Sequence, residues 1–344
     1  MIDKKKYYFG EKYSEIVMGL SIAASWTWAP ALILSTDIAA NKGLYGMLSF
    51  IIPNIIALLF FGYIQTKIPT GIITAKNLFK HAGVGYFYDF SMLLIQICCI
   101  CIQITAGANV LKLITGFNYI IIVFLLVGGI FLYSYTGGFH YSVKTDVYQH
   151  LVLLVGTPVL LGYFFFSKEI NYLAQHVFNI NDTLLFFLIL LSGPFMDNQH
   201  WQRSYNTERN NKPFYWGAFF FAIPLICLSL IGLFAGRQGN YISLSLFKGH
   251  SKWLLIICLL SGLFSTLDSS LASILTIFYT SNEKIFFGKL KMLLGVLLST
   301  GVIIFNIDIL KFWKTYGTIR IGFAFIILLN ILCLQNRKKR NITC

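Results

Sequence analysis

The 344-residue sequence has few charged side chains. Only 12% of its residues are Asp, Glu, Lys or Arg and 57% are hydrophobic, whereas an average soluble domain has about 25% charged and 45 to 50% apolar residues. This shortage excludes an ordinary water-soluble fold. Ten membrane spans of about 20 residues would take roughly 200 residues, which leaves no room for a separate soluble domain. We therefore expect residues 1–344 to form a single transmembrane domain.

Acidic residues are scarcer than basic ones, 13 against 27, so the formal net charge is +14. Nucleic-acid-binding proteins have such an excess, but their cations gather on one basic face. Here Lys and Arg separate the apolar runs from one another. We expect no nucleic-acid partner and attribute the charge to membrane topology.

Paired cysteine motifs and catalytic motifs are also missing. The seven cysteines lie mostly inside apolar runs, without two CxxC pairs or a neighbouring His, which indicates small buried apolar residues rather than a metal or redox site. There is no HExxH, Walker or GxGxxG pattern, so we expect no enzymatic activity. The polar, basic start leads into a span too long for a cleavable signal, so no cleavage is expected.

What the sequence has is long apolar runs bounded by charged or turn-forming clusters. Runs longer than about 18 residues predict membrane-spanning helices. Ten are expected, near residues 14–36, 46–66, 86–111, 118–136, 147–166, 182–200, 213–235, 253–280, 290–308 and 314–335.

The distribution of cations between the loops predicts the orientation. If the N-terminus is cytoplasmic, eighteen of the Lys and Arg residues lie inside and nine outside, with Arg203 counted inside and Arg320 outside. This agrees with the positive-inside rule. We expect an integral protein of the plasma membrane with both termini in the cytoplasm.

Two of the ten predicted spans contain helix breakers. Span 1 has Pro30 at its middle, and span 6 has Ser192, Gly193 and Pro194 in succession. Interrupted helices at matching positions of two halves indicate an inverted-repeat transporter, with one repeat over about 14–166 and the second over about 182–335. The alternative is a pair of ordinary proline kinks.

A third feature is a row of oxygen-bearing residues in span 8. Gly262, Ser265 and Thr266 are spaced i, i+3 and i+4 and share one helical face. Hydroxyl and carbonyl oxygens are the ligands that a hard cation such as sodium prefers. Small residues that allow close helix packing are the alternative explanation. Asp268, one turn further, is either functional or hydrogen-bonded to Ser269, Ser270 or a neighbouring helix.

Two other polar stretches flank spans. After the breakers of span 6, Asp197 and Gln199 fit the wall of a cavity, while Arg203 fits the cytoplasmic end of the span. Between spans 4 and 5, the pair Gly137 and Gly138 predicts a tight turn. Asp146, close to the start of span 5, is explained either by capping of that helix or by attraction of a cation that leaves toward the cytoplasm.

Four motifs in this order resemble the sodium/solute symporter family. They are SWTWA in span 1, YTGG with KTDVYQ before span 5, DNQHWQR after the span 6 breakers and STLDSSL in span 8, and together they extend from about residue 19 to 272. The residues of these motifs are most similar to those of the branch that includes urea and polyamine transporters. This chain is shorter than most members, because it has no extra leading helix and no helices beyond the ten-span core.

The resemblance implies a leucine-transporter-like fold: two inverted five-helix repeats, with helices 1 and 6 broken, that work by alternating access driven by a sodium gradient. Matched by position, the implied sodium ligands are Ala24, Thr27, Gly262, Ser265 and Thr266, with Asp146 near the inner sodium exit. Solute contacts are expected at Trp26, Trp28, Asp197 and Gln199.

The sequence therefore predicts an all-α membrane protein that carries a small polar solute together with sodium across the lipid bilayer. Tryptophans, amides and one acid suit a cationic or amide-bearing solute. Two alternatives stay open: a proton-coupled symporter, and a non-transporting sensor or assembly subunit that keeps the fold.

Overall fold

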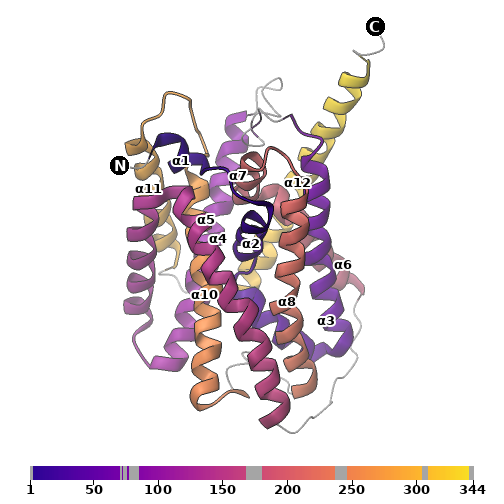
Figure 1. Ribbon diagram of the computed structural model, residues 1–344, viewed down its shortest axis with the longest axis vertical. Coiled ribbons are helices and arrows are strands. Elements are labelled where there is room, and N and C mark those ends of the chain that lie inside the picture. Colours follow the sequence, from indigo (N-terminus) through magenta and orange to yellow (C-terminus); the bar gives the residue numbers. More distant parts are fainter. Residues whose placement is uncertain are drawn as a thin grey trace.

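The computed structural model describes residues 3–69, 72, 76, 85–167, 180–236, 246–303 and 309–340. Within these ranges the regular structure is entirely helical, as predicted (Figure 1). The helices are α1 (Lys4–Phe9), α2 (Glu15–Trp26), α3 (Ala29–Gln65), α4 (Gly85–Thr115), α5 (Tyr119–Ser167), α6 (Ile180–Met196), α7 (Asn198–Asn206), α8 (Lys212–Ala235), α10 (Gly249–Ile274), α11 (Ile285–Ile303) and α12 (Ile309–Arg340).

Helix length and surface composition both indicate a membrane protein. Among the described residues, six helical segments are long and apolar enough to cross a bilayer, and three shorter apolar helices accompany them. Large apolar side chains point outward, for example Leu125, Leu132 and Phe166, which are 66%, 70% and 95% exposed. Such an outer surface is stable in lipid and not in water.

Two interruptions divide helices where the sequence has breakers. Between α2 and α3, Thr27 and Trp28 are not helical, and Pro30 is the second residue of α3, where proline is tolerated. Between α6 and α7 the extended residue is Asp197, whose side chain accepts a hydrogen bond from the backbone N–H of Gln199. The second break therefore falls three residues after Pro194, which lies inside α6.

Glycines at positive φ divide two other long helices. Gly43 has φ +66° inside α3, and a Cβ added at Gly46 would lie 2.6 Å from the carbonyl oxygen of Ile38. Residues eight apart in a straight helix are separated by about 12 Å, so the chain turns back at Gly43. Gly138 has φ +56° inside α5, at the turn that the glycine pair predicts.

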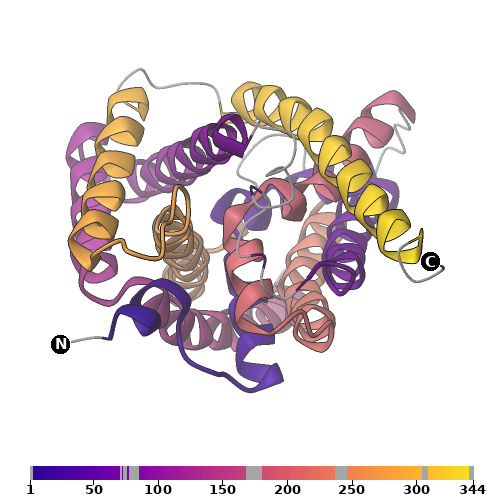
Figure 2. The same cartoon turned by 90° about the horizontal axis from the view of Figure 1, so that it is seen from above.

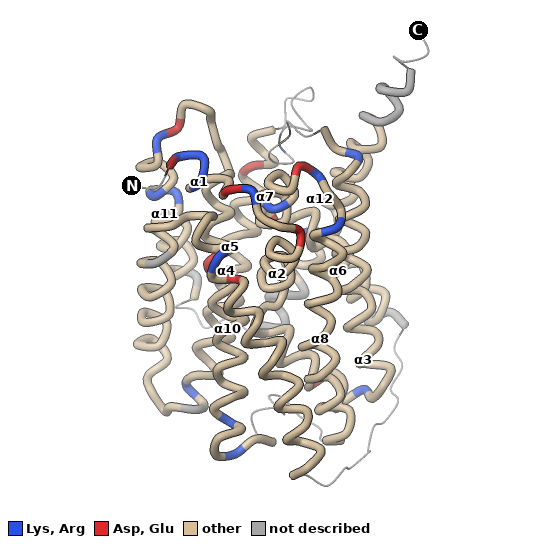
Figure 3. Tube along the Cα trace, viewed as in Figure 1, with Lys and Arg blue, Asp and Glu red and all other residues tan. Residues whose placement is uncertain are grey.

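The two ends of the chain lie at the same end of the molecule. Figure 1 shows α1 and the end of α12 on opposite sides of the same end of the molecule, and Figure 3 shows most Lys, Arg, Asp and Glu residues at this end. Seen from above, α10 stands inside the bundle, with α11 to one side and α12 at the opposite edge (Figure 2).

The N-terminal segment is part of the packed structure, which the sequence alone did not reveal. Tyr7, Tyr8 and Phe9 of α1 are buried. The Tyr8 hydroxyl donates to Glu283 at 2.8 Å, between α10 and α11, and Gln202 of α7 donates to the Tyr8 carbonyl oxygen at 2.7 Å. Helix α1 thus ties α7 to the α10–α11 connection.

The turn at Gly138 yields the first prediction. A Cβ there would lie 2.5 Å from the Tyr7 carbonyl oxygen, at a φ that L-residues avoid. Because a left-handed conformation costs a non-glycine residue about 1 to 2 kcal/mol, we expect Gly138→Ala to lower the thermal unfolding midpoint in detergent. The matched control is Gly128→Ala in the same helix, which meets no atom within 4 Å. Equal melting of the two variants would contradict a strained turn.

Candidate functional site

The first break brings α2 against the oxygen-bearing face of α10. A Cβ added at Gly262 would lie 2.8 Å from the Thr27 carbonyl oxygen, so the two backbones approach closely only because residue 262 is glycine. Ser265 and Thr266, on the same face, are buried. The residues predicted to bind sodium therefore lie along one interface, between the end of α2 and the middle of α10.

The hydroxyl groups of Thr266 and Ser265 both donate their protons to protein oxygens. Thr266 donates to the Gly262 carbonyl oxygen at 3.0 Å, and Ser265 donates to Asp146 Oδ1 at 2.7 Å. A hydroxyl that donates its proton elsewhere keeps oxygen lone pairs for a cation. Ala24, one turn before the end of α2, offers its carbonyl, which accepts from the Thr27 N–H at 3.1 Å. These neutral oxygens suit sodium, and their binding of it stays a prediction.

Beside this interface is a buried ion pair between Asp146 of α5 and Arg203 of α7. Both side chains are 0% exposed, and Nη2 of Arg203 lies 2.6 Å from Oδ2 of Asp146. Ser21 of α2 donates to the same oxygen at 2.6 Å, and Arg203 also donates to Ser269 of α10 at 2.7 Å. One charge pair thus connects four helices.

This pair corrects two of the sequence interpretations. Arg203 is not a solvent-exposed charge at the end of the span, because its side chain is fully buried and pairs with the buried carboxylate of Asp146. Asp146 does not cap a helix, since α5 continues on both sides of it and the residue lies eight positions after Gly138. Asp146 contacts the predicted sodium residues through the hydroxyl of Ser265. The guanidinium of Arg203 already balances the charge of its carboxylate.

Asp268 has a structural set of partners on the neighbouring helix. Ser142 of α5 donates to its Oδ1 at 3.0 Å and Thr145 donates to its Oδ2 at 2.8 Å. Of the two explanations for an acid inside span 8, the hydrogen bond to a neighbouring helix fits these contacts.

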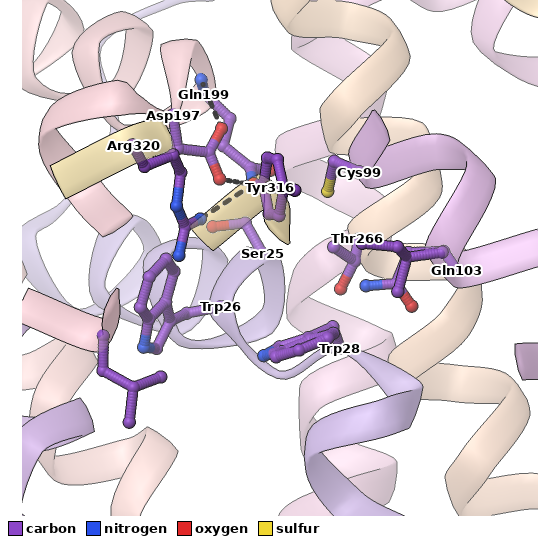
Figure 4. A pocket seen from close by; sticks show the side chains of 12 residues that line it. Ser25, Trp26, Trp28, Cys99, Gln103, Asp197, Gln199, Thr266, Tyr316 and Arg320 are labelled. Atoms are coloured by element: carbon purple, nitrogen blue, oxygen red, sulfur yellow. Dashed lines mark hydrogen bonds between the residues drawn. The ribbon is translucent and has the colours of Figure 1, made fainter. Parts of the chain in front are cut away.

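A cavity lies between the two breaks (Figure 4). All four residues predicted to contact solute line it: Trp26, Trp28, Asp197 and Gln199. Thr266 lines it as well, so the cavity and the predicted sodium residues share a side chain. Its volume, counted as the space open to the centres of water molecules, is about 30 Å³. That the four residues bind solute remains a prediction.

The acid of this cavity is fully engaged by amide groups. Gln96 of α4 donates to Asp197 Oδ1 at 2.8 Å, and the backbone N–H of Gln199 donates to the same oxygen at 3.2 Å. The side-chain amide of Gln199 donates to Oδ2. Trp26 packs over Gly193, where a Cβ would lie 2.3 Å from the indole ring. The glycine beside Pro194 therefore makes room for the tryptophan.

The cavity also has polar residues that sequence reasoning missed. Gln103 of α4 and Arg320 of α12 line it, and Arg320 is only 5% exposed. The prediction that Arg320 is an outer loop charge is wrong, because Arg320 lies within α12 and its side chain is buried at the cavity. A lone arginine within the apolar run 314–335 was the available signal, because ionisable residues inside spans mark functional sites.

The buried pair yields the second prediction. Removing one partner leaves an uncompensated buried charge, which costs about 3 to 5 kcal/mol. We therefore expect Asp146→Asn and Arg203→Gln each to lower the thermal unfolding midpoint strongly, and the double variant to lose less than the sum.

The matched control is the surface pair Lys6 and Glu11, joined at 2.9 Å. The hydrogen bond from Lys6 lowers the pKa of Glu11 below its usual value, yet solvent screens such pairs, so Lys6→Ala should hardly change the midpoint. Strictly additive losses at Asp146 and Arg203 would show that the two do not act as a pair.

Comparisons with known proteins identify related membrane transporters. Residues 7–183 match the model of the Sodium:solute symporter family, which is half of the chain. The chain is 23% identical over 256 residues to the probable urea active transporter 1 of Schizosaccharomyces pombe, a match covering 62% of this chain and 38% of the relative. It is 25% identical over 166 residues to the sodium/pantothenate symporter of Haemophilus influenzae, covering 45% and 34%.

Solved structures share the fold. A Na⁺-coupled sialic acid symporter in its substrate-bound outward-open state superposes with a TM-score of 0.69 at 14% identity, covering 88% of this chain and 76% of the other. A manganese transporter of Eremococcus coleocola superposes with a TM-score of 0.60 at 11% identity, covering 96% and 83%. With the family match over half its length, the chain belongs to the sodium:solute symporter family, whose members are transporters and not enzymes.

Proposed function

We propose that the protein is a secondary active transporter that carries a small polar solute together with sodium by alternating access. The observation that carries the proposal is the shared wall of the cavity: Thr266 belongs both to the α10 face predicted to bind sodium and to the cavity at the two helix breaks. A cation bound there would lie beside the solute. Its charge would then favour the same conformation that the solute favours, which is the requirement for coupling.

The proposal includes the finer architecture that the symporter fold implies. The helices would form ten crossings in two inverted repeats, over about 14–166 and 182–335. The breaks at Thr27–Trp28 and at Asp197 support this, because they would fall in the first helix of each repeat. An unwound segment inside a bilayer frees backbone carbonyls and amides, which persist only where a ligand or cavity faces them.

We also place the end that carries α1 and the last turns of α12 in the cytoplasm of a plasma-membrane protein. The excess of cations at that side supports this orientation. The relatives are named for urea and pantothenate and the solved structure for sialic acid, all small polar solutes. The matched regions span 38% and 34% of the two relatives' lengths, so the activity of the whole protein is part of the proposal.

The third prediction tests sodium coupling directly. We expect the purified protein to bind radioactive sodium and to raise its unfolding midpoint with sodium but not with potassium, because a ligand of the native state stabilises it. The double substitution Ser265→Ala with Thr266→Ala removes two oxygen ligands and should abolish both effects. In vesicles it should abolish sodium-driven uptake of urea, pantothenate or sialic acid, whichever the wild type accumulates.

The control variant is Ser251→Ala on the same helix, whose hydroxyl donates only to the Lys248 carbonyl oxygen in its own turn. It should retain sodium binding, and Thr266→Ser should retain most of it. Uptake that ignores sodium and the double substitution but follows a proton gradient would replace sodium with proton coupling. A folded wild type that binds no sodium and accumulates no solute would favour the non-transporting alternative.

A further inference from the structure

We propose that the solute of this cavity is a small carboxylate, and that Arg320 binds its carboxyl group. The inference rests on the proposed transport function and names the class of solute for the same site. It follows from the hydrogen-bonding groups that the cavity leaves unused and from the balance of charge around it.

Arg320 is a buried cation without a carboxylate partner. Its Nη1 donates to the Tyr316 hydroxyl at 2.8 Å and its Nη2 donates to the Ile189 carbonyl oxygen at 3.0 Å, while Nε has no partner. It makes no ion pair with any carboxylate in the part of the chain that the structure describes, Asp197 included. Holding an unpaired guanidinium among membrane helices is costly. Such a group is retained where an anion arrives to pair with it.

Two further unused groups at the cavity are also hydrogen-bond donors. The indole N–H of Trp26 and the amide N–H₂ of Gln103 are buried and have no partner among the described residues. The Gln103 oxygen is already occupied, since it accepts the backbone N–H of Ala29 at 3.3 Å. In Figure 4 the Gln103 amide nitrogen is directed toward Thr266 and the cavity. Because these N–H groups have no acceptor in the protein, they favour a solute that brings acceptor oxygens.

The acid of the cavity is not free to select a cation. Asp197 accepts three N–H groups from Gln96 and Gln199, which leaves about one of the roughly four lone-pair positions of a carboxylate for a solute. Three side-chain nitrogens on this wall have no partner among the described residues, against one side-chain amide oxygen, Oε1 of Gln199. A cationic solute would also meet the positive charge of Arg320. This disfavours the cationic solute that the sequence suggested.

Charge balance separates a carboxylate from a neutral amide. With sodium at the α10 face, the cavity would hold the cations of sodium and Arg320 against the single carboxylate of Asp197. An incoming carboxylate makes the sum zero, and it pairs with a guanidinium through two parallel hydrogen bonds. An amide oxygen also accepts hydrogen bonds but leaves the second positive charge uncompensated. Sodium would then attract the solute electrostatically, which gives the coupling a physical basis.

The size of the cavity limits the solute further. About 30 Å³ is open to water centres, and one buried water needs at least about 10 to 15 Å³ on this measure. The space therefore holds a molecule of a few non-hydrogen atoms. Trp28, Ile102 and Leu190 also line the cavity and would cover a short carbon chain. A carboxylate of two or three carbons fits this description.

The experiment compares matched solutes on the full-length protein in sodium. Acetate, propionate, lactate and pyruvate are each titrated against the corresponding amide, and acetate and propionate also against ethylamine and propylamine, with the thermal unfolding midpoint as readout. We expect at least one carboxylate to bind at least tenfold more tightly than its amide and its amine. Arg320→Gln should weaken that carboxylate at least tenfold and Arg320→Lys less, because lysine keeps the charge and loses the two-pronged geometry.

Controls keep the outcomes distinguishable. Arg209→Gln removes another buried arginine that lines no part of this cavity, and it should keep the carboxylate affinity of the wild type. The midpoint shift with sodium alone should survive in the Arg320 variants, which shows that they are folded and that the cation site is intact.

The inference is overturned if no carboxylate binds, if an amide or amine binds as tightly, or if binding is unchanged in an Arg320→Gln protein that still responds to sodium. A wild type that binds the carboxylate equally well with and without sodium, and shows no sodium response, would overturn symport and leave the assignment of Arg320 standing.

Discussion

The buried pair of Asp146 and Arg203 is the interaction on which the arrangement of the centre depends. Asp146 comes from α5 and Arg203 from α7, and serines of α2 and α10 complete their hydrogen bonds. Neither charge is tolerable alone among apolar helices, because desolvation costs more than any single contact returns. The pair therefore fixes which helices meet at the first break. It also orients Ser265, whose hydroxyl donates its proton to Asp146.

Around this pair, charge and polarity are arranged in two neighbouring sets. In the first, a carboxylate is neutralised by an internal guanidinium and serves the packing of four helices. In the second, Asp197 accepts hydrogen bonds from amide N–H groups, and Nε of Arg320 has no partner among the described residues. The two sets differ in their hydrogen bonds. The groups of the first set all have protein partners and hold the helices together, whereas the second set has unused donors and lines the cavity.

Much of the fold could be predicted from the sequence, since long apolar runs and their breakers are local properties. Pro30 and Pro194 predicted both interruptions to within three residues, since the breaks lie at Thr27–Trp28 and at Asp197. The pair Gly137 and Gly138 predicted a turn. The partners of buried charges could not be predicted in this way. Arg203 and Asp146 are 57 positions apart in sequence, and their pairing depends on how α5 packs beside α7. Arg320 was misplaced for a different reason, because counting loop charges assigns every cation to a loop. Helical spacing indicated Gly262, Ser265 and Thr266, and the family resemblance added Ala24, Thr27 and the tryptophans, but neither source gives the partners of these residues.

The packing of α1 has a practical consequence for handling the protein. The three aromatic side chains of α1 are buried, and α1 contacts α5, α7 and the α10–α11 connection. A fusion partner or affinity tag placed just ahead of Lys4 would therefore disturb a helix that covers one end of the bundle. Helix α12, in contrast, continues beyond the other helices at that end (Figure 1). Labels, tags and surface attachments for biophysical work belong at the end of α12 near Arg340, twenty residues beyond Arg320 of the cavity.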